Sequence, residues 1–254
     1  IDYCNVKNVK IIEDCAISLG GRYSKSFLHV GSKSDYSIFS FGVFKTISTI
    51  SGGILFVKKK EEHKEILNEV NDQIEIKFFH LFLKIFNKLK FQIFLNKYLF
   101  NIIFFRLIKY SEIYGFKNLS KYLKNDPYPK KNNSIPSNYL DKTTKFQIKE
   151  IFIQLDNVKS IIKARLENAK ILEDILIDNK NLILPSINKD CDTFQTYPIL
   201  IKNSQKEKLY QFLLKQNFDT SKYYYRNCSS LSIFREFGKN CINSEFYSNN
   251  VITL

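Results

Sequence analysis

The stretch "SIFSFGVFKTISTISGG" (residues 37–53) is the most informative part of this chain. Its aromatic and apolar start is typical of a buried strand, and the glycine pair at its end marks a tight turn. Between them lies a single lysine, Lys45. The chain is rich in lysine, and most lysines in proteins are exposed at the surface. Whether Lys45 is a surface lysine or a functional one must therefore be judged from the sequence around it.

Three short β-rich runs surround this stretch, and they predict an α/β sheet. They are "VKII" (9–12), which leads into Glu13 and Asp14, "YSIFSF" (36–41) and "GGILFVKK" (52–59), and a polar helix is expected at 60–73. In such sheets, functional groups gather beyond the carboxyl ends of the strands. Asp14 and Lys45 each follow a strand, which makes both of them candidates.

Composition bounds the class of protein. With 254 residues, 44% hydrophobic and 25% charged, the chain is globular and long enough for one large domain or two smaller ones. Its net charge of +14 would suit a nucleic-acid partner. However, Lys, Asn, Ile and Phe are abundant while Gly, Pro and Trp are scarce, which is the drift expected from an AT-rich genome. No zinc-finger spacing or RNA-binding aromatic motif is visible, so we predict no nucleic-acid partner.

The cysteines and the first residue give two further expectations. The five cysteines are scattered and contain no C-x-x-C pair, which argues against a disulfide framework or a zinc site and favours the cytoplasm. The sequence starts at Ile1, contains no methionine and shows no signal peptide. We therefore expect a piece of a longer protein that lacks its beginning.

Residues 77–109 form a segment of unusual composition. It contains many aromatic residues, seven Lys or Arg and no Asp or Glu, and its apolar residues recur at helical spacing. Two or more amphipathic helices are predicted. No uninterrupted apolar run approaches the roughly 18–20 residues that span a bilayer. Two interpretations stay open: a membrane-surface element, or an insert whose aromatic face packs on the rest of the protein or on a second subunit.

The remainder of the chain predicts a linker and a small α+β domain. "KNDPYPKKNNSIPSN" (124–138) holds three of the five prolines and is typical of a linker. A long helix is predicted over 144–176, a strand at about 195–201, a helix over 204–217 and a strand over 218–225.

The ordered set of motifs resembles the DegT/DnrJ/StrS-type aminotransferases, which use pyridoxal 5′-phosphate (PLP) and act on nucleotide-linked sugars. Their usual pattern runs E-D-x-A-Q-x-x-G, then G-x-x-G-D-x-x-x-F-S-F, then K and a G-E-G-G turn. The matching residues are Glu13, Asp14, Ala16, Gly20, Gly31, Asp35, Phe39, Ser40, Phe41, Lys45, Gly52 and Gly53. In the carboxyl half, "ARLENA" (164–169) resembles the R-x-E-N-A core of the family's long helix, "TFQTYPILI" (193–201) the first strand of its small domain, and "NCINSEFYSNNVITL" (240–254) its last motif.

The resemblance implies a fold and a division of the chain. The fold is an α/β, aspartate aminotransferase-like PLP-dependent transferase, with a partial large domain and a small α+β C-terminal domain. Residues 1–75 would be the C-terminal part of the PLP-binding large domain, and 76–125 the basic aromatic helical insert. Residues 126–142 would be the linker, and 143–254 the long helix with the small domain.

The resemblance also assigns roles to three residues. Lys45 matches the lysine that holds PLP as a Schiff base, the internal aldimine, and later moves a proton. Asp14 matches the carboxylate that keeps the ring nitrogen protonated. Ser40 matches a hydroxyl donor to the phosphate. These three residues are the predicted cofactor site, with Lys45 catalytic and no metal involved.

The chain departs from the family pattern at several positions. Ile17 stands where the family has Gln or His, Ser51 replaces the acid of the G-E-G-G turn, and Asn243 stands where proline is expected. The family's N-terminal portion, which supplies a phosphate-binding turn and an aromatic lid over the ring, is missing. Because sites in this family borrow residues from a second subunit, a homodimer is implied.

Two functions follow as expectations. The first is a PLP-dependent aminotransferase that converts a keto group on a nucleotide-linked sugar to an amine for amino-sugar or surface polysaccharide synthesis, with glutamate as donor. The retained Lys45 disfavours the family's dehydratase branch, in which the lysine is replaced. The alternative is a truncated, non-catalytic relative that serves as a binding or structural subunit. Tyr223, Tyr224 or Tyr225 could lie near a substrate, or could pack within the small domain.

Overall fold

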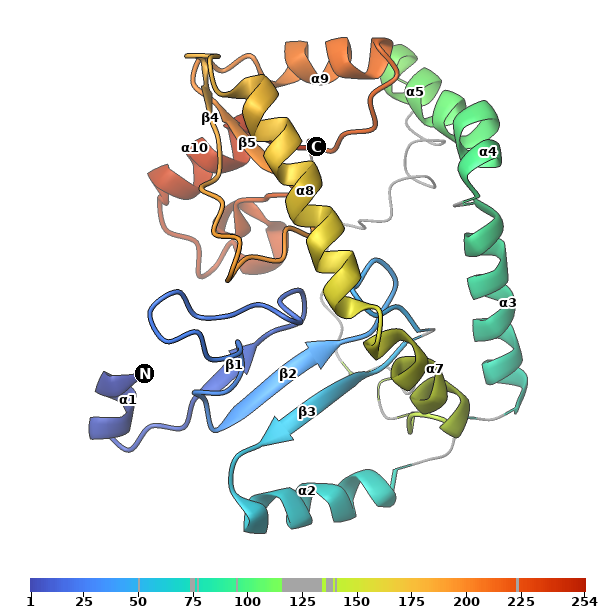
Figure 1. The fold of residues 1–254 in the computed structure, drawn as a ribbon, viewed down its shortest axis with the longest axis vertical. Helices are drawn as coiled ribbons and strands as arrows, with labels where there is room; N and C mark the ends of the chain where they lie inside the picture. The colour runs from blue at the N-terminus through green and yellow to red at the C-terminus, as the bar shows by residue number, and fades with distance from the viewer. Residues whose placement is uncertain are drawn as a thin grey trace. The chain divides into compact units, whose positions relative to one another are not determined.

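The computed structural model shown in Figure 1 describes residues 1–49, 51–73, 76, 78–94, 96–115, 134–135, 139, 141–222 and 224–254. The chain forms two compact units. The first unit comprises Ile1–Lys88, Ile135–Ile171 and Ile187–Gln195, and the second comprises Leu89–Ser134, Leu172–Ser186 and Thr196–Leu254. This division differs from the boundary expected at residue 143, because the helices that follow residue 143 pack against the sheet of the first unit.

The first unit is built on a three-stranded sheet of order β1-β2-β3. Its strands are β1 (Ile12–Asp14), β2 (Tyr36–Ser40) and β3 (Gly53–Val57). β1 and β2 run parallel, whereas β2 and β3 run antiparallel. The short helix α1 (Asp2–Val6) precedes the sheet and α2 (Lys60–Asn71) follows it. The two strands predicted around residues 36–41 and 52–59 and the predicted helix are confirmed. The first strand lies later than the predicted 9–12 and contains Asp14 as its last residue, rather than ending before it.

The two faces of this sheet differ in exposure. Ser37 and Phe39 point to one face and are buried. Ile38 and Ser40 alternate with them and therefore point to the other face, where Ile38 is 44% exposed. Among the described residues, one face of the sheet is thus covered by the core and the other is open.

The core of the first unit joins the sheet to two helices, α7 (Lys145–Leu155) and α8 (Val158–Leu176). Its buried members are Cys15, Phe39, Phe41, Ile47, Ile151 and Val158. The prediction of a single helix over 144–176 is therefore wrong, because the helix is interrupted by a turn at Asp156 and Asn157. Side chains of Asp and Asn compete for backbone hydrogen bonds and favour helix ends. At its start, α7 carries a capping box formed by Thr144 and Gln147.

The basic aromatic segment is helical, as predicted. It contains α3 (Phe78–Phe94), α4 (Lys97–Leu99), a π-helical turn η1 (Phe100–Phe104) and α5 (Phe105–Tyr114). Within the described part of the chain, no single helix is long and apolar enough to cross a membrane. Only α3 taken together with residues 97–114, bent by 60° at their junction, meets those criteria of length and composition. Most of the predicted linker lies outside the described residues.

The second unit contains an antiparallel sheet of order β4-β5-β6. Its elements are β4 (Leu182–Ile183), β5 (Pro198–Ile201), α9 (Lys206–Lys215), η3 (Cys228–Ser230), η4 (Ser232–Phe234), α10 (Ile242–Asn250) and β6 (Val251–Thr253). The strand predicted over 218–225 is wrong for the described residues. Only Ser221 pairs with the sheet, through an isolated bridge to Thr253, and β6 itself is only three residues long.

The start of β3 gives a test of the fold. A Cβ placed on Gly53 would lie 2.4 Å from the carbonyl oxygen of Phe39, whereas one on Gly42 would come no closer than 3.7 Å to the Ser40 Oγ. We expect Gly53→Ala to lower the free energy of unfolding by roughly 1–3 kcal/mol in urea titrations, because backbone must move. Gly42→Ala is the matched control and should stay within about 0.5 kcal/mol of wild type. Equal stability of the two variants would contradict this interpretation.

Candidate active site at the strand ends of the first unit

Asp14 and Ser40 lie at the carboxyl ends of two parallel strands. Asp14 is the last residue of β1 and is in register with Ile38 of β2. Ser40 follows Ile38 by two residues, so its side chain points to the same face of the sheet as that of Asp14. This is the open face. The two predicted cofactor residues therefore share one face and one edge.

The carboxylate of Asp14 is held by its own turn. Its Oδ1 accepts a hydrogen bond of 2.9 Å from the backbone N–H of Ala16, and the side chain is exposed. The preceding Glu13 points to the opposite face, where the hydroxyl of Tyr23 donates to its Oε1. The backbone thus separates two consecutive carboxylates, and only Asp14 is presented on the open face.

Burial and negative charge act together on the residue beside Asp14. Cys15 is fully buried. Burial, followed by the carboxylates of Glu13 and Asp14, raises the pKa of the Cys15 thiol to about 11. The pKa of Tyr23 rises to about 12, because of burial first and then its hydrogen bond to Glu13. Both groups are therefore neutral at physiological pH and add no charge to the surroundings of Asp14.

Lys45 lies on a closed loop, residues 41–52, which we call the Lys45 loop. Its ends are tied by the N–H of Phe41 to the carbonyl of Gly52 (2.9 Å) and by the N–H of Thr49 to the carbonyl of Phe41 (2.8 Å). Phe41, Ile47 and Thr49 are almost completely buried beneath the loop. Ile50 lies outside the described residues. The loop is thus a packed element rather than a surface excursion.

The backbone next to Lys45 is locally unusual. Phe44 has a φ of +66°, a left-handed conformation that is costly for a side-chain-bearing residue. Lys45 itself is half-buried. Among the described residues, its ammonium group has no hydrogen-bond or ion-pair partner. The lysine is therefore presented on a constrained backbone with its amine uncommitted.

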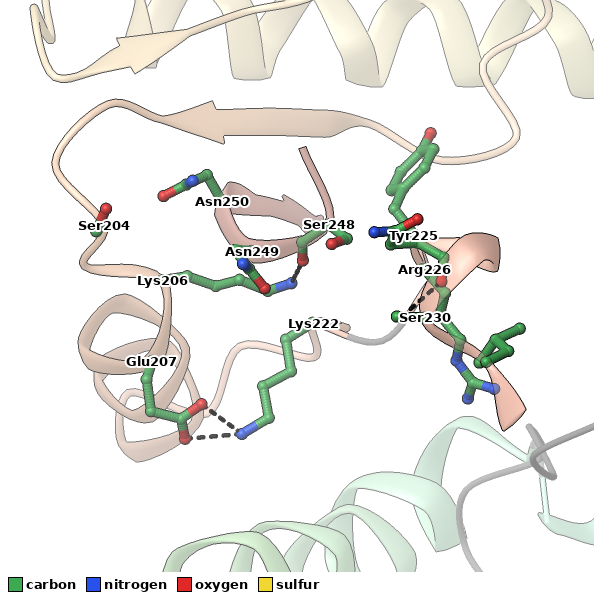
Figure 2. A pocket seen from close by; sticks show the side chains of 12 residues that line it. Ser204, Lys206, Glu207, Lys222, Tyr225, Arg226, Ser230, Ser248, Asn249 and Asn250 are labelled. Carbon is green, nitrogen blue, oxygen red and sulfur yellow. Dashed lines mark hydrogen bonds and ion pairs between the residues drawn. The ribbon is translucent and has the colours of Figure 1, made fainter. Parts of the chain in front are cut away.

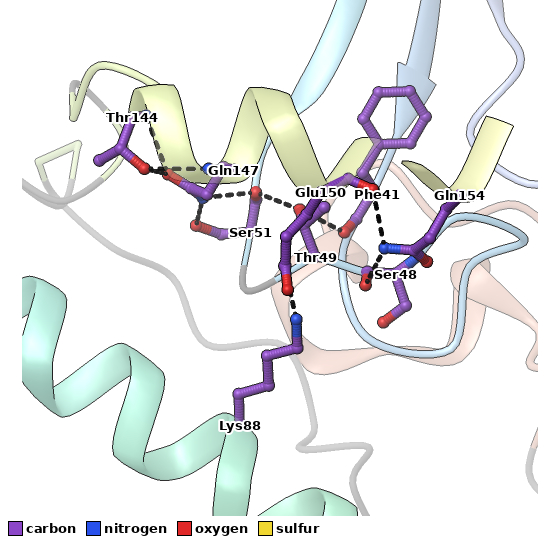
Figure 3. Close-up of polar contacts among 9 residues, drawn as sticks. All are labelled: Phe41, Ser48, Thr49, Ser51, Lys88, Thr144, Gln147, Glu150 and Gln154. Atoms are coloured by element: carbon purple, nitrogen blue, oxygen red, sulfur yellow. Dashed lines mark hydrogen bonds and ion pairs between the residues drawn. The ribbon is translucent and has the colours of Figure 1, made fainter. Parts of the chain in front are cut away.

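Two glutamines of α7 hold the Lys45 loop (Figure 3). The side-chain amide of Gln154 pairs with both backbone groups of Ser48: it accepts from the N–H at 3.0 Å and donates to the carbonyl at 3.1 Å. Gln147 donates to the carbonyl of Ser51 at 2.8 Å. These two residues lie seven apart on the helix, which places them on one face. The family's acid at position 51 is absent, and the Ser51 backbone serves here as an acceptor.

Two further side chains hold the residues directly before and after Lys45. Arg165 of α8 donates to the hydroxyl of Thr46 at 2.9 Å, and Gln195 donates to the carbonyl of Phe44. Burial lowers the pKa of Arg165. Sequence reasoning quoted Arg165 only as part of a motif and assigned no role to the three glutamines. The glutamine spacing of seven and the Thr144–Gln147 capping box were the only signals that could have suggested them.

The residues present fit a PLP site, although they supply only part of one. PLP requires an amine, a carboxylate for its ring nitrogen, and donors for its phosphate. Lys45 has an uncommitted amine, and Asp14 has an exposed carboxylate. The Ser40 hydroxyl lies 3.4 Å from the N–H of Gly42. At the position where the family has Gln or His, Ile17 is exposed and offers no polar group.

A polar pocket lies within the second unit (Figure 2). It has a volume of about 720 Å³, and Lys206, Lys222, Tyr225 and Arg226 are among the residues that line it. Lys222 forms an ion pair with Glu207 at 2.6 Å, and Lys206 donates to the backbone carbonyl of Ser248 at 2.7 Å. The two lysines therefore already have protein partners that join α9 to its neighbours.

The three tyrosines considered near a substrate are only partly placed. Tyr225 lines this pocket. The ring of Tyr224 contacts the ring of Tyr225 edge to face, with the ring centroids 5.2 Å apart. Tyr223 lies outside the described residues. A substrate contact through any of the three stays a prediction.

Solved structures share this fold. Helicobacter pylori PseC, an aminotransferase involved in the biosynthesis of pseudoaminic acid, superposes with a TM-score of 0.66 at 17% identity, over 100% of this chain and 56% of PseC. S. venezuelae DesV, solved with a ketimine intermediate, gives 0.66 at 16% identity over 100% and 54%. E. coli GDP-4-keto-6-deoxy-D-mannose-3-dehydratase, solved with bound hydrated PLP, gives 0.62 at 14% identity over 100% and 57%. This chain therefore spans about half the length of these proteins.

These similarities show that the chain has part of the aspartate aminotransferase-like α/β fold (fold type I) that the motifs implied. A model of the DegT/DnrJ/EryC1/StrS aminotransferase family matches residues 1–75 and 131–254, so the chain belongs to that family. The match leaves out residues 76–130, which contain α3 to α5. A comparison with curated protein sequences gives no match.

The role of Gln154 can be tested directly. We expect Gln154→Ala to leave the Ser48 backbone unpaired and to lower the free energy of unfolding by about 1–3 kcal/mol. Amide hydrogen exchange across the Lys45 loop should accelerate. Gln92 on α3 is exposed, and Gln92→Ala is the matched control. Unchanged exchange at residues 42–49 in the Gln154 variant would show that the contact does not hold the loop.

The Cys15 thiol predicts an alkaline stability profile. Its ordinary pKa is 9.0 and its folded pKa is about 11. The folded state therefore retains the proton longer than the unfolded state, and the contribution of Cys15 is complete below pH 9 and is lost as pH rises to about 11. We expect the stability difference between wild type and Cys15→Ala to shrink over this range in urea titrations. The exposed Cys241 supplies the control, and Cys241→Ala should show no such trend.

Proposed function

We propose that the protein containing this chain is an aminotransferase that uses PLP, attached covalently to Lys45, to convert a keto group of a nucleotide-linked sugar to an amine. The observation that carries the proposal is the Lys45 loop. It presents one uncommitted amine on a backbone held at Phe44, Thr46, Ser48 and Ser51. This loop directly follows Ser40 and connects β2 to β3 of the sheet that carries Asp14.

Each residue then has a defined task. When bound, PLP supplies an electron sink that stabilises negative charge on the substrate carbon. The Lys45 amine holds the cofactor and, once released from it, accepts and returns the proton at that carbon. The Asp14 carboxylate accepts a hydrogen bond from the protonated ring nitrogen and keeps that proton in place. The Ser40 hydroxyl, whose oxygen accepts from the N–H of Gly42, offers its O–H as a donor to the phosphate.

The substrate class follows from what the similar proteins are described to act on. PseC is involved in the biosynthesis of pseudoaminic acid, DesI was solved with its TDP-sugar product, and the dehydratase is named for a GDP-linked keto-sugar. We extend this to a nucleotide-linked keto-sugar for amino-sugar or surface polysaccharide synthesis, with glutamate as the amino donor and a homodimer as the active assembly. The cytoplasmic location stays a prediction from the cysteine pattern. All five cysteines are free thiols.

Two other functions are less well supported. The family's dehydratase branch replaces the lysine, whereas Lys45 is present here on a constrained loop. A non-catalytic relative is not favoured by the family match.

Covalent trapping tests the proposal. The chain would be incubated with PLP and reduced with borohydride, which adds hydride to a carbon–nitrogen double bond and fixes the cofactor on its lysine. We expect mass spectrometry to locate the phosphopyridoxyl group on Lys45 and the Lys45→Ala variant to lose it along with the visible absorption of lysine-bound PLP. Lys58 is exposed and follows β3, so Lys58→Ala is the matched control and should retain both signals. Modification spread over other lysines, with no preference for Lys45, would refute the assignment.

A further inference from the structure

Helix α3 turns its basic side toward the protein. Lys84 forms an ion pair with Asp141 at 2.9 Å, and Lys88 forms one with Glu150 of α7 at 2.5 Å (Figure 3). Both lysine side chains are largely buried, at 25% and 19% exposure. The ion pairs of Lys84 and Lys88 thus attach the helix to the first unit. From the amphipathic pattern alone, these lysines would be expected to face solvent.

The apolar side of α3 consequently points outward. Its residues recur at steps of three and four, which places them on one continuous stripe. We call its exposed members, which have fractional exposures from 40% to 83%, the aromatic face: Phe78, Phe79, Phe82, Leu83, Phe86, Leu89 and Ile93. Within the first unit, the members of this face up to Phe86 therefore remain exposed rather than packed.

The segment after α3 repeats this arrangement within the second unit. Lys109 of α5 donates to the carbonyl of Lys215 and to the Oδ1 of Asn217, both at 2.9 Å, and Phe105 and Ser111 are buried. Large apolar residues again remain exposed: Ile102, Ile103, Leu107, Tyr110 and Tyr114. Exposed apolar surface of this extent normally marks a binding site.

The charge of the segment indicates which kind of partner binds the aromatic face. Residues 77–109 contain seven basic residues and no acid. Among the described ones, Lys97 and Arg106 are exposed. A second copy would bring the same cations against them with no carboxylate from this segment to neutralise them. An anionic lipid surface supplies the opposite charge and an apolar interior at once.

We propose that the aromatic face binds the surface of an anionic bilayer, with its phenylalanine side chains in the interfacial region and the exposed cations of the segment among the lipid headgroups. The ion pairs of Lys84 and Lys88 keep one side of α3 on the protein, so the helix contacts lipid with its other side only. This contact would hold the protein at a membrane surface. It does not depend on the proposed aminotransferase activity.

The absence of tryptophan from the chain allows a sharp test. Phe86→Trp introduces a single fluorophore on the aromatic face, and Phe237→Trp introduces one at an exposed site (75%) in the second unit. With vesicles of phosphatidylglycerol and phosphatidylcholine, we expect the emission of the Phe86→Trp variant to shift to the blue and to become protected from iodide. The emission of the Phe237→Trp control should not change. No shift in the Phe86→Trp variant at low salt would overturn the proposal.

Vesicle flotation separates specific insertion from adsorption of a basic protein. We expect wild type to float with anionic vesicles and not with pure phosphatidylcholine, and the Phe82→Glu/Phe86→Glu double variant to lose at least about tenfold in bound fraction. The matched control is Phe218→Glu/Phe237→Glu, at two other exposed sites. It should lose far less than the first variant. Equal loss in both variants would indicate general electrostatic adsorption and would overturn the proposal.

Measuring the oligomeric state tests the alternative that the aromatic face binds a second copy of the chain. Circular dichroism first verifies that the double variant is folded, as expected for substitutions at exposed positions. Light scattering of wild type and of Phe82→Glu/Phe86→Glu in the absence of lipid should then give the same mass. A wild-type oligomer that the double variant converts to monomer would make the aromatic face an interface between copies, and the membrane proposal would be overturned.

Discussion

The side-chain contacts to the backbone of the Lys45 loop are the constraint on which the rest of the first unit depends. The loop buries Thr46, Ile47 and Thr49, and its described part has no neighbouring strand to pair with its backbone. Backbone N–H and C=O groups that are withdrawn from water need partners. Gln154, Gln147 and Gln195 bond the backbone of Ser48, Ser51 and Phe44, respectively, from elements distant in sequence, and Arg165 adds a contact to the Thr46 hydroxyl. Fixing α7 and α8 against the sheet and positioning Lys45 are thus one structural task.

The two-residue period of the strands places the core residues on one face of the sheet and the candidate site residues on the other. Residues of one parity on β1 and β2, such as Glu13 and Phe39, face the core. Residues of the other parity, Asp14 and Ser40, face the open side at the carboxyl ends of parallel strands. A shift of one residue in register would exchange the two sets. The same alternation that builds the core therefore also presents the candidate site.

The fold and the family were accessible from the sequence because they rest on order and spacing. The strands around Ser40 and Gly53, the helices of residues 77–109 and the set Asp14, Ser40 and Lys45 are all local patterns. The break between α7 and α8 and the absence of a strand among the described residues after Ser221 and before β6 were not predicted. The helix breaks at Asp156 and Asn157, whose side chains favour helix ends, although the apolar stripe continues on both sides of them. The strand is missing because only Ser221 finds a partner, Thr253, and a strand persists only where its partner extends with it.

The sequence by itself determined which residues are candidates for the chemistry, through the order and spacing of its motifs. It also determined which side chains share a helix or strand face, since periodicity is a property of the local backbone. Only the tertiary structure decided what each face meets. It placed Gln147 and Gln154 on the Lys45 loop, and it turned the lysines of α3 inward and its phenylalanines outward. The physical reason is that the ion-pair partners of Lys84 and Lys88 are Asp141 and Glu150, far along the chain, and no local pattern records where those acids will lie.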